Sequence, residues 1–535
     1  MRVAVRRGII YVQAPRVLYG ALAEVPGSFW NNEYQCFEMP DNPLTRNELR
    51  MLDVALPGED GHPDEVPGAK TRPWAHQVAA YWHARRLLEA GIGAMLAMEM
   101  GTGKSKVAVD LICTLPGVSR VLILCPKSVV PVWGVQFERH SSREYTVTAL
   151  SDGSVRQRAA LVASLRKSAG SSGGITAVAV NYDAFWRPGL FNELAAFAPD
   201  MLVCDESHRL QAPGGKASRS AATLAKKIRY RLALTGTPMS SGPMALYGQY
   251  RVIAPEVFGT SFSRFRDRYA VMGGFENKQV LGVRDETAFS RKFHSVAFVA
   301  KADDVLDLPP AVDVRVSVNL SASAMKVYRE MDEEFVADVG EGLVTASNGL
   351  TRILRLMQIT SGHVCTEDGT EVEVDRSKRE ALADLIDGMG GEPVAVFCLF
   401  RKDLQVVREV AEAAGLPYCE VSGSENTISA WRSGVIGVQI QSGSEGIDLT
   451  LARYAVYYSL NHSLFKYEQS RARIRRPGQT RPVTYYSLVA EGTVDEDIYL
   501  ALERKQNVVE AVIAAAKGGR AWTKHNATQQ CLKNG

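Results

Sequence analysis

The sequence lacks the features that mark membrane and secreted proteins. None of its apolar stretches approaches the roughly 20 residues that a helix needs to span a bilayer, so we expect no contact with a membrane. No unbroken apolar segment follows the basic N-terminus, and we therefore expect no signal peptide. The eight cysteines form no C-x-x-C pair, and several lie in apolar runs, where a thiol behaves as a small hydrophobe. These absences favour a reducing, cytoplasmic compartment.

The chain also has little excess charge. Its formal net charge is only +3 at pH 7, which neither requires nor excludes nucleic acid as a partner, because the local distribution of charge decides that. Hydrophobic residues make up 46% and charged residues 23% of the chain, as in an ordinary globular protein. A length of 535 residues is too great for one hydrophobic core and predicts two or three domains.

Breaks in composition divide the chain into five segments. A stretch dense in proline, glycine and acids begins after Leu56, and Leu308-Pro309-Pro310 marks a second boundary. Short apolar runs alternate with helical stretches after each boundary, which predicts parallel sheets covered on both faces. The expected fold class is α/β, with two parallel-sheet lobes in tandem and a small N-terminal α+β unit. The predicted segments are the N-terminal unit at 1–56, a linker at 57–69, a first lobe at 70–308, a second lobe at 309–517 and a flexible tail at 518–535.

The apolar runs also predict individual strands. One is expected at 9–12 in the N-terminal unit, and those of the first lobe are expected at 94–97, 121–125, 175–180, 201–204 and 231–234. The second lobe has runs at 394–399, 438–440, 455–460 and 483–489. Thr493-Val494-Asp495-Glu496 is typical of a capping box and predicts a helix that reaches about Lys517.

The most informative segment is Met98-Glu99-Met100-Gly101-Thr102-Gly103-Lys104-Ser105, between a predicted strand and an amphipathic run. Small residues such as Gly101, Thr102 and Gly103 let backbone N–H groups close around phosphate oxygens, and a helix N-terminus adds positive potential. Lys104 would reach the β/γ-phosphates of a nucleotide, and the Ser105 hydroxyl would bind Mg²⁺. The match to G-x-x-x-x-G-K-[ST] is imperfect because Met98 replaces the first glycine. The competing interpretation is a chance glycine turn.

Two carboxylates follow the buried run at 201–204. Ligands of open α/β sheets bind at the carboxyl ends of strands, where Asp205 and Glu206 would lie. Asp205 can hold Mg²⁺ directly or through water, and Glu206 can orient and activate the attacking water. Both roles suit phosphoryl transfer. The plainer alternative is an acidic surface turn.

Two further segments have weaker signals. The hydroxyls of Thr235-Gly236-Thr237-Pro238 could hydrogen-bond the region of Asp205 and Glu206 and report nucleotide state, although a simple Gly-Pro turn has the same sequence. The amide of Gln77 could bind the edge of adenine, although a surface glutamine is commonplace.

The second lobe contains an arginine-rich segment, Gln469 to Gln479. Arg473 and Arg476 lie three residues apart, so on a helix they would share one face. Directed across a cleft between lobes, they could stabilise charge on the transferring phosphate. The alternative is a basic nucleic-acid patch, and both can hold for different arginines. Upstream, Gly446 allows close approach of a ligand, and Asp448 could bind ribose or tether an arginine.

Taken together, these residues resemble those of the superfamily 2 helicase-like ATPases, specifically the Swi/Snf-type double-stranded DNA translocases. They follow the family's order over about residues 70–505. The motifs that carry the resemblance are Trp74-Ala75-His76-Gln77, Met98 to Ser105, Cys125-Pro126-Lys127-Ser128 with Trp133, Asn181-Tyr182, Asp205-Glu206-Ser207-His208, Leu234 to Pro238, Ser442 to Leu449 and Gln469 to Gln479.

The resemblance implies two RecA-like lobes with ATP in the cleft between them and Mg²⁺ as the metal. It implies that Gln77 contacts adenine and that Lys104 and Ser105 serve phosphate and Mg²⁺. By the same resemblance, Asp205 and Glu206 are the Mg²⁺ and water residues, and two residues of the arginine-rich segment, Arg473 and Arg476, are arginine fingers.

The sequence departs from the family's pattern in three places. Arg475 stands where histidine is frequent, and Asn461-His462-Ser463 replaces a tryptophan-containing segment. The region after Pro238 is short for a chromatin remodeller, and no histone-reading module is evident, so we do not expect nucleosome remodelling. A compact bacterial or phage member fits these departures.

The segment from Val25 to Pro40 faintly resembles the HARP-type module of annealing helicases. Nearby arginines without acids could grip DNA phosphates. We expect the aromatic residues to form the small core of this unit instead; they are Phe29, Trp30, Tyr34 and Phe37. In the first lobe, the spacing of Phe262, Phe265 and Tyr269 predicts an amphipathic helix with that face buried.

The function predicted from these motifs is a DNA-dependent ATPase that translocates on double-stranded DNA in repair, replication-fork handling or recombination. One alternative is a strand-separating helicase on single-stranded DNA or RNA. A second is the motor subunit of a restriction or defence complex, whose protein partners would supply nuclease or other activity. A nucleotide-gated clamp is disfavoured, because Glu206, Arg473 and Arg476 are all present. We expect the cytoplasm of a bacterium or of a phage-infected host cell.

Overall fold

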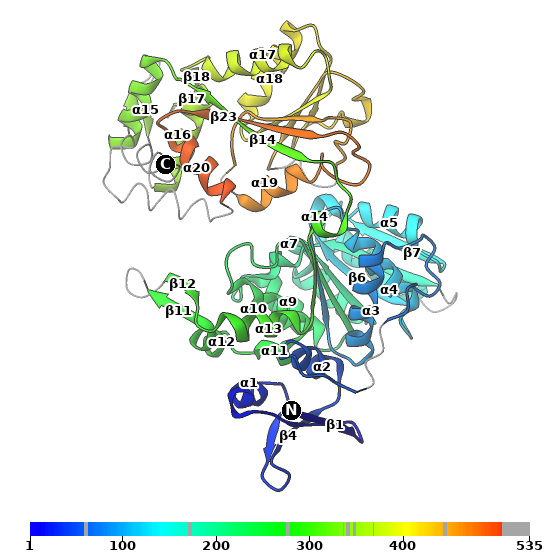
Figure 1. Ribbon diagram of the computed structural model, residues 1–535. Coiled ribbons are helices and arrows are strands. Elements are labelled where there is room, and N and C mark those ends of the chain that lie inside the picture. Colours follow the sequence, from blue (N-terminus) through cyan, green and yellow to red (C-terminus); the bar gives the residue numbers. More distant parts are fainter. Residues whose placement is uncertain are drawn as a thin grey trace. The chain divides into compact units, whose positions relative to one another are not determined.

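The computed structural model describes residues 1–57, 62–168, 174–273, 279–334, 336–338, 343–345, 349–366, 369–441, 447–461 and 463–504. The chain divides into two compact units, Met1–Leu306 and Asp307–Gly535, and each is described by itself (Figure 1). In the described part of the chain, no helix combines the length and the apolar composition needed to cross a membrane.

The first unit is built on a seven-stranded parallel sheet with the strand order β13-β5-β10-β9-β6-β8-β7. The strands β5 and β9 are buried at every position, which explains why they consist of continuous apolar runs. The strands are β5 (Ala94–Met98), β6 (Arg120–Cys125), β7 (Tyr145–Leu150), β8 (Ile175–Asn181), β9 (Met201–Asp205), β10 (Tyr230–Thr235) and β13 (Ala297–Ala300).

Helices pack against both faces of this sheet. One group consists of α3 (Ala75–Glu89), α4 (Lys104–Thr114) and α5 (Val132–His140), which contact one another in turn. The others follow the later strands and are α6 (Val155–Ser168), α7 (Tyr182–Phe185), α8 (Pro188–Ala196), α9 (Lys216–Ala225), α10 (Ala245–Ile253), α11 (Pro255–Phe258), α12 (Phe262–Tyr269), α13 (Glu286–His294) and α14 (Ala302–Val305). Phe265 and Tyr269 of α12 are buried, as the spacing predicted, whereas Phe262 is only half-buried. A hairpin of β11 (Ala270–Gly273) and β12 (Gln279–Val283) follows α12.

The second unit contains a six-stranded parallel sheet with the order β14-β23-β22-β19-β21-β20. Its strands are β14 (Ala311–Val318), β19 (Val394–Cys398), β20 (Tyr418–Val421), β21 (Val435–Gln439), β22 (Tyr454–Tyr457) and β23 (Val483–Ala490). Its helices are α15 (Ala322–Glu334), α16 (Gly349–Thr360), α17 (Ser377–Gly388), α18 (Arg401–Ala413), α19 (Leu464–Arg471) and α20 (Val494–Glu503). Two short ribbons complete it, β15 (Val336–Asp338) with β16 (Leu343–Thr345) and β17 (His363–Cys365) with β18 (Glu371–Glu373). The two sheets confirm the expected fold class of two α/β, RecA-like lobes.

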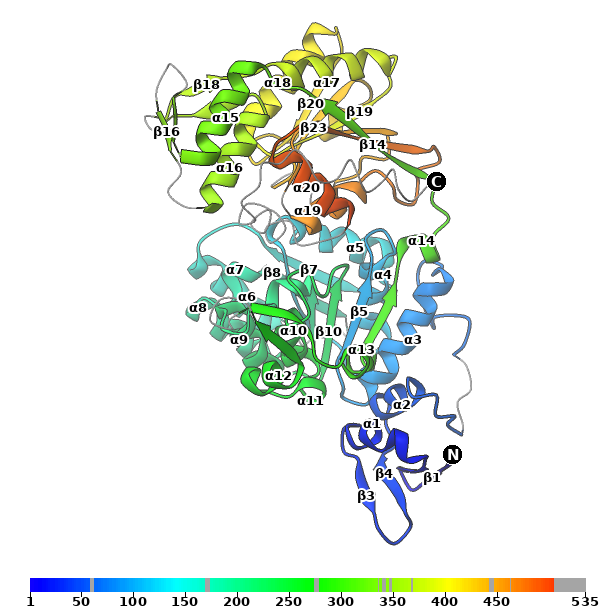
Figure 2. The same cartoon turned by 60° about the vertical axis from the view of Figure 1, so that its left-hand side comes forward.

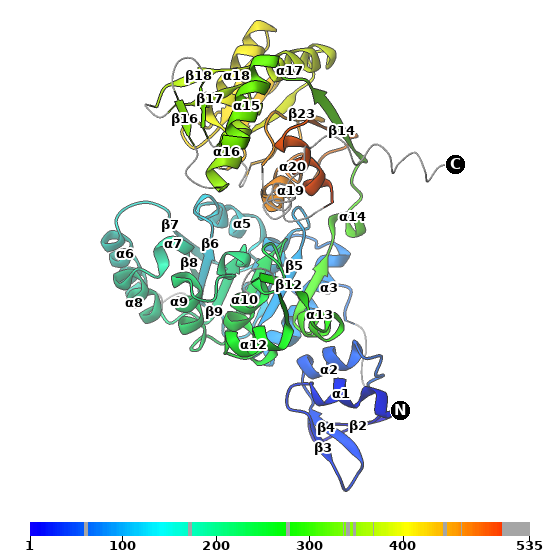
Figure 3. The same cartoon turned by 90° about the vertical axis from the view of Figure 1, so that its left-hand side faces the viewer.

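A small antiparallel sheet, in the order β1-β2-β4-β3, forms the N-terminal part of the first unit. Its strands are β1 (Arg2–Arg6), β2 (Ile9–Gln13), β3 (Phe29–Asn31) and β4 (Cys36–Pro40), accompanied by α1 (Tyr19–Ala23) and α2 (Pro43–Arg50). In Figures 2 and 3 the β3–β4 hairpin points away from the parallel sheet, whereas α2 lies against that part of the unit. The helix α2 contacts α3 and α13.

Buried charges join this N-terminal part to the parallel sheet's helices. Lys292 of α13 lies 2.8 Å from a carboxylate oxygen of Glu48, and both side chains are almost fully buried. Lys292 also donates to the carbonyl oxygen of Glu24, and Arg291 forms an ion pair with the Glu24 carboxylate. Asn47 donates to the carbonyl oxygen of Ser295. The N-terminal part is therefore packed onto α13 through specific polar contacts.

The structure corrects some details of the sequence predictions. Four strands of the two parallel sheets were missed: β7, β13, β14 and β20 lie at sheet edges, where short or partly exposed runs give a weak apolar signal. The predicted aromatic core of the N-terminal part is only half correct. Trp30 and Phe37 pack with Tyr19, but Phe29 and Tyr34 are 55% and 58% exposed. The end of the predicted C-terminal helix near Lys517 and the predicted tail at 518–535 lie outside the described residues.

Candidate nucleotide site

The phosphate loop joins β5 to α4 in the first unit. Gly101 and Gly103 have φ angles of 83° and 85°, in the left-handed region that favours glycine. A Cβ atom at Gly103 would overlap the amide of Gln77, so the loop also needs glycine there for space. Met98 is the last residue of β5 and is fully buried, which explains why an apolar residue stands where the consensus has glycine.

Lys104 folds back over the loop that precedes it. Its Nζ donates to the carbonyl oxygens of Met98 at 2.7 Å and Glu99 at 3.1 Å. The Thr102 hydroxyl donates to the same Glu99 oxygen at 2.6 Å. The Lys104 ammonium is thus held at the loop by carbonyl oxygens, which phosphate oxygens could replace. Ser105 follows in the first turn of α4.

Gln77 is buried against this loop. Its Nε2 donates to the carbonyl oxygen of Thr102 at 3.1 Å, and its Oε1 accepts from the backbone N–H of Trp74 at 3.0 Å. His76 Nε2 lies 2.8 Å from the same Thr102 oxygen. These contacts give Gln77 and His76 a loop-positioning role that the sequence did not predict. Contact of Gln77 with adenine stays a prediction.

Asp205 and Glu206 stand at the carboxyl end of β9. Asp205 is the last strand residue, and its Oδ1 accepts from the Glu206 backbone N–H at 3.0 Å. The buried indole of Trp133 donates to Oδ2 of Asp205 at 3.2 Å. Burial, reinforced by the neighbouring Glu206 charge, raises the pKa of Asp205 to about 7, whereas Lys104 acts to lower it. The charge of Lys104 therefore acts on this carboxylate.

Glu206 adopts a strained backbone conformation. Its φ of 50° is uncommon for a residue with a side chain, and such strain is often found at functional sites. Glu206 Oε2 lies 3.3 Å from His208 Nδ1, and the Thr235 hydroxyl lies 3.4 Å from the same nitrogen. The Thr235 hydroxyl in turn accepts from the Thr237 N–H at 3.1 Å. The predicted link between the threonine turn and the carboxylates is therefore present, but it passes through His208.

These side chains fit a nucleotide with Mg²⁺. Carboxylate and hydroxyl oxygens are the donors that Mg²⁺ prefers, and Asp205 with Ser105 could supply one of each. The Thr237 hydroxyl is buried and has no hydrogen-bond partner among the described residues, so it could accept or donate a bond to a ligand. Tyr182 fixes the end of β9 by donating to the carbonyl oxygen of Asp205 at 2.8 Å. The sequence analysis predicted no role for Trp133 or Tyr182, although both belong to the motifs that carry the family resemblance.

The arginine segment of the second unit differs from the predicted helix. The helix α19 ends at Arg471, and Arg473 and Arg476 lie in the turns that lead to Pro477-Gly478. The prediction that these two arginines share one face of a helix is therefore wrong. Arg471 is half-buried: it forms an ion pair with Asp313, and its guanidinium lies 3.8 Å from the Tyr485 ring centroid. The arginine-finger roles of Arg473 and Arg476 stay predictions.

The segment around Asp448 is described only from residue 447, and the predicted ligand residue Gly446 lies outside the described residues. Asp448 is exposed, and its Oδ2 lies 3.7 Å from Nη1 of Arg476. Its Oδ1 accepts from the Thr450 N–H. Of the two predicted roles of Asp448, tethering an arginine matches a contact in the structure, whereas ribose binding is untested.

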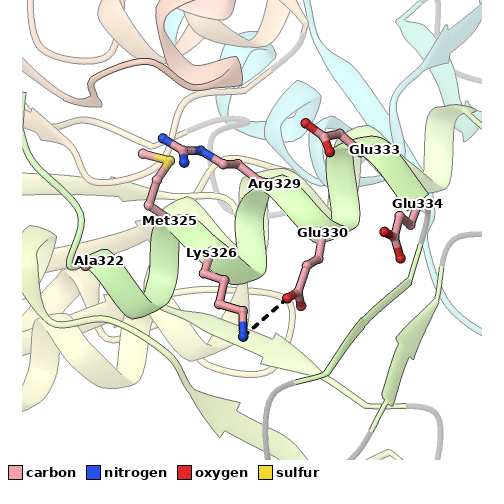
Figure 4. A pocket seen from close by; sticks show the side chains of 7 residues that line it. All are labelled: Ala322, Met325, Lys326, Arg329, Glu330, Glu333 and Glu334. Carbon is pink, nitrogen blue, oxygen red and sulfur yellow. Dashed lines mark ion pairs between the residues drawn. The ribbon is translucent and has the colours of Figure 1, made fainter.

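A pocket in the second unit runs along α15 (Figure 4). Its two basic residues precede its three glutamates along the helix, and Lys326 Nζ lies 3.7 Å from a carboxylate oxygen of Glu330. This pocket has no glycine loop, and its acidic end would repel phosphate. The lining side chains are Ala322, Met325, Lys326, Arg329, Glu330, Glu333 and Glu334.

The chain is similar in sequence to several known proteins. Putative protein p41 of Acyrthosiphon pisum secondary endosymbiont phage 1 is 26% identical over 365 residues, which are 63% of this chain and 77% of that protein. Mouse chromodomain-helicase-DNA-binding protein 1-like is 25% identical over 79% of this chain and 48% of its own length. Chicken DNA repair and recombination protein RAD54B is 23% identical over 79% of this chain and 52% of its own length.

The chain thus spans about half the length of the two vertebrate relatives. Among solved structures, the Sulfolobus solfataricus SWI2/SNF2 ATPase core in complex with dsDNA has a TM-score of 0.40 and 21% identity, over 86% of this chain and 96% of that one. The model of the SNF2-related domain matches residues 75–368, more than half of the chain. The chain therefore belongs to the SNF2-related family of helicase-like ATPases.

Proposed function

We propose that this protein hydrolyses ATP and uses the energy to translocate on double-stranded DNA. The observation that carries the proposal is the placement of the Lys104 loop after β5 and of Asp205 and Glu206 at the end of β9, with the charge of Lys104 acting on Asp205, within a chain of the SNF2-related family. Relatives named for DNA repair and recombination, RAD54B and RDH54, support DNA as the partner.

The chemistry follows from the positions of the side chains. The backbone N–H groups of the loop at 99–103 and the N-terminus of α4 would bind the phosphates, and Lys104 would exchange its carbonyl partners for phosphate oxygens. Ser105 and Asp205 would hold Mg²⁺, which neutralises charge on the phosphates when bound. Glu206 would orient the attacking water, with His208 holding its carboxylate in place. Arg473 and Arg476 of the second unit would stabilise the transferring phosphate.

The domain organisation belongs to the same proposal. Residues 70–308 would form the nucleotide-binding lobe, 309–517 the second lobe, and 1–56 an accessory DNA-binding unit. Backbone contacts would make DNA binding largely independent of sequence and sensitive to salt. The setting we propose is DNA repair, replication-fork handling or recombination in the cytoplasm of a bacterium or phage-infected cell.

The variant Lys104→Ala tests the nucleotide site. Loss of the ammonium should lower steady-state ATP hydrolysis in the presence of duplex DNA by at least about 100-fold, as loss of a transition-state charge does elsewhere. Lys227→Ala is the matched control. Lys227 is exposed and precedes the amino end of β10, whereas the candidate site lies at the carboxyl ends of the strands. Hydrolysis by Lys104→Ala at the rate of the Lys227→Ala control would contradict the assignment of the site.

A further inference from the structure

A buried amide outside the sequence motifs joins the two turns that flank the candidate site. Gln249 belongs to α10 and is fully buried, although glutamine is rarely found without exposure. Its Oε1 accepts from the Ser207 hydroxyl at 2.8 Å, and its Nε2 donates to the carbonyl oxygen of Pro238 at 2.7 Å. Ser207 stands between Glu206 and His208, and Pro238 ends the threonine turn.

The partners determine the orientation of this amide. The carbonyl oxygen of Pro238 can only accept, so the NH₂ group of Gln249 must face it. The same group also donates to the carbonyl oxygen of Ala245 at 3.1 Å, one turn earlier in α10. The oxygen of the amide then faces Ser207, whose hydroxyl must be the donor. Every polar atom of Gln249 thus has a partner, and a flipped amide would lose the two hydrogen bonds to the carbonyl oxygens of Pro238 and Ala245.

Packing leaves α10 no freedom against the turn that carries Ser207. A Cβ atom at Gly248 would overlap the carbonyl oxygen of Leu210, the last residue of the 3₁₀ turn Ser207–Leu210. The helix backbone therefore lies directly on this turn, and the adjacent Gln249 reaches the turn that follows β10. Because Ser207 is itself fully buried, the bonds are shielded from water.

We propose that Gln249 is a positioning residue for ATP hydrolysis. It sets the spacing between the turn that holds Glu206 and His208 and the turn that holds Thr235 and Thr237, so that the contacts of His208 with Glu206 and Thr235 persist through turnover. The proposal rests on the proposed function. Gln249 would affect the rate of the chemical step and not the affinity for nucleotide, because it touches neither the phosphate loop nor the segment at 74–77.

The test compares Gln249→Met with Tyr250→Phe in the full chain. Methionine preserves the volume and burial of the side chain but removes all its hydrogen bonds. Tyr250, the next residue of α10, is also fully buried, and its hydroxyl donates to the carbonyl oxygen of Phe293, away from the site. The two variants therefore lose buried hydrogen bonds from the same helix, but only one loses those to the candidate site.

We expect Gln249→Met to lower kcat for DNA-stimulated ATP hydrolysis by roughly 10- to 100-fold, because small displacements of catalytic groups have effects of this size. Its KM for ATP should stay within about 3-fold of the wild-type value, since uniform binding is untouched. Tyr250→Phe should lower the melting temperature without changing kcat. The double variant with Ser207→Ala should be no slower than Gln249→Met alone, because both changes break the same bond.

Three results would overturn the proposal. A wild-type kcat in Gln249→Met would show that the amide bonds are irrelevant to turnover. Equal effects of Gln249→Met and Tyr250→Phe on kcat and melting temperature would show a purely structural role. Wild-type protein without any ATP hydrolysis would contradict the proposed function together with this inference, whereas the first two results contradict the inference alone.

Discussion

At the scale of single residues, three central side chains of the candidate site already have partners within the protein, whereas the buried Thr237 hydroxyl has none among the described residues. Lys104 bonds to loop carbonyls, Gln77 bonds to Thr102, and Asp205 accepts from the indole of Trp133. For these three side chains, ligand binding would replace existing hydrogen bonds. The existing bonds lower the free-energy cost of burying the charged groups before a ligand binds. Lys104 and Asp205 are the groups for which such an exchange matters most.

A pH dependence of stability follows from His83 of α3. Its Nε2 is buried and has no partner among the described residues, and burial lowers its pKa from 6.5 to about 4. In the unfolded chain the ring takes up a proton below pH 6.5, but in the folded protein only near pH 4. The contribution of neutral His83 to the free energy of unfolding is therefore complete above pH 6.5. It is lost as the pH falls from 6.5 towards 4, and the loss is about 2 kcal/mol at pH 5.

His83→Gln should flatten this dependence. Melting temperatures measured at pH 7.5 and pH 5 should differ less for His83→Gln than for the wild-type protein. The exposed His62→Gln is the control and should behave as wild type. Identical pH dependence in all three proteins would show that His83 does not carry this effect.

The sequence predicted the site residues that can be recognised by their type and by their position after an apolar run. Lys104, Asp205 and Glu206 stand at fixed places after apolar strands, so their type and position could be recognised. Gln249 and His76 could not, because their importance lies in which distant atoms they touch, and no local pattern distinguishes them from ordinary polar residues. The partner of Arg471, Asp313, lies 158 residues away in sequence, which likewise made this arginine impossible to separate from its neighbours.

At the scale of elements, the strand ends decide where the site lies. The pairing of Leu234 with Asp205 brings the threonine turn beside the carboxylates, and β5 pairs with β10 on its other side. The apolar runs predicted these central strands well because both faces are buried. The edge strands β7 and β13 escaped prediction because a sheet edge does not demand an uninterrupted apolar run.

The contact between α2 and α13 predicts a stability effect. The pKa of Glu48 is raised and that of Lys292 lowered, in both cases mainly by burial, so each charge depends on its partner for stabilisation. Glu48→Gln should reduce the free energy of unfolding by about 3–5 kcal/mol, because it leaves a buried ammonium without its counter-charge. Denaturant unfolding followed by circular dichroism would measure the change.

Glu33→Gln, at an exposed position of the same N-terminal part, is the matched control and should have little effect. Combining Glu48→Gln with Lys292→Met should recover part of the loss, since no buried charge then remains unpaired. A Glu48→Gln protein as stable as the control would contradict the predicted role of this pair.

The outer face of the N-terminal sheet is a candidate for DNA contact. The strand register places Arg2 and Arg6 of β1 on the same face as Tyr11 and Phe29, with Val5 on the opposite face. Replacing Arg2, Arg6 and Arg7 by glutamine should weaken duplex binding and reduce the slope of log affinity against log salt by about one unit per lost phosphate contact. Arg229→Gln on the parallel-sheet part is the control, and an unchanged salt slope would exclude this face.

At the scale of the whole molecule, the two RecA-like lobes lie on one chain, and translocation requires that ATP turnover in the first lobe be coupled to DNA. The two vertebrate relatives are longer, and this chain matches about half the length of each. Stimulation by nucleic acid is the property that separates the proposed translocase from its alternatives.

The most direct test is steady-state ATP hydrolysis with no nucleic acid, single-stranded DNA, blunt duplex DNA or RNA, at one fixed salt concentration. The proposed function predicts that duplex DNA stimulates hydrolysis most strongly and that Lys104→Ala abolishes the stimulated rate. Stronger stimulation by single strands or RNA would contradict duplex translocation in favour of a strand-separating helicase. Hydrolysis unaffected by every nucleic acid would contradict an independent motor and point to a missing partner subunit.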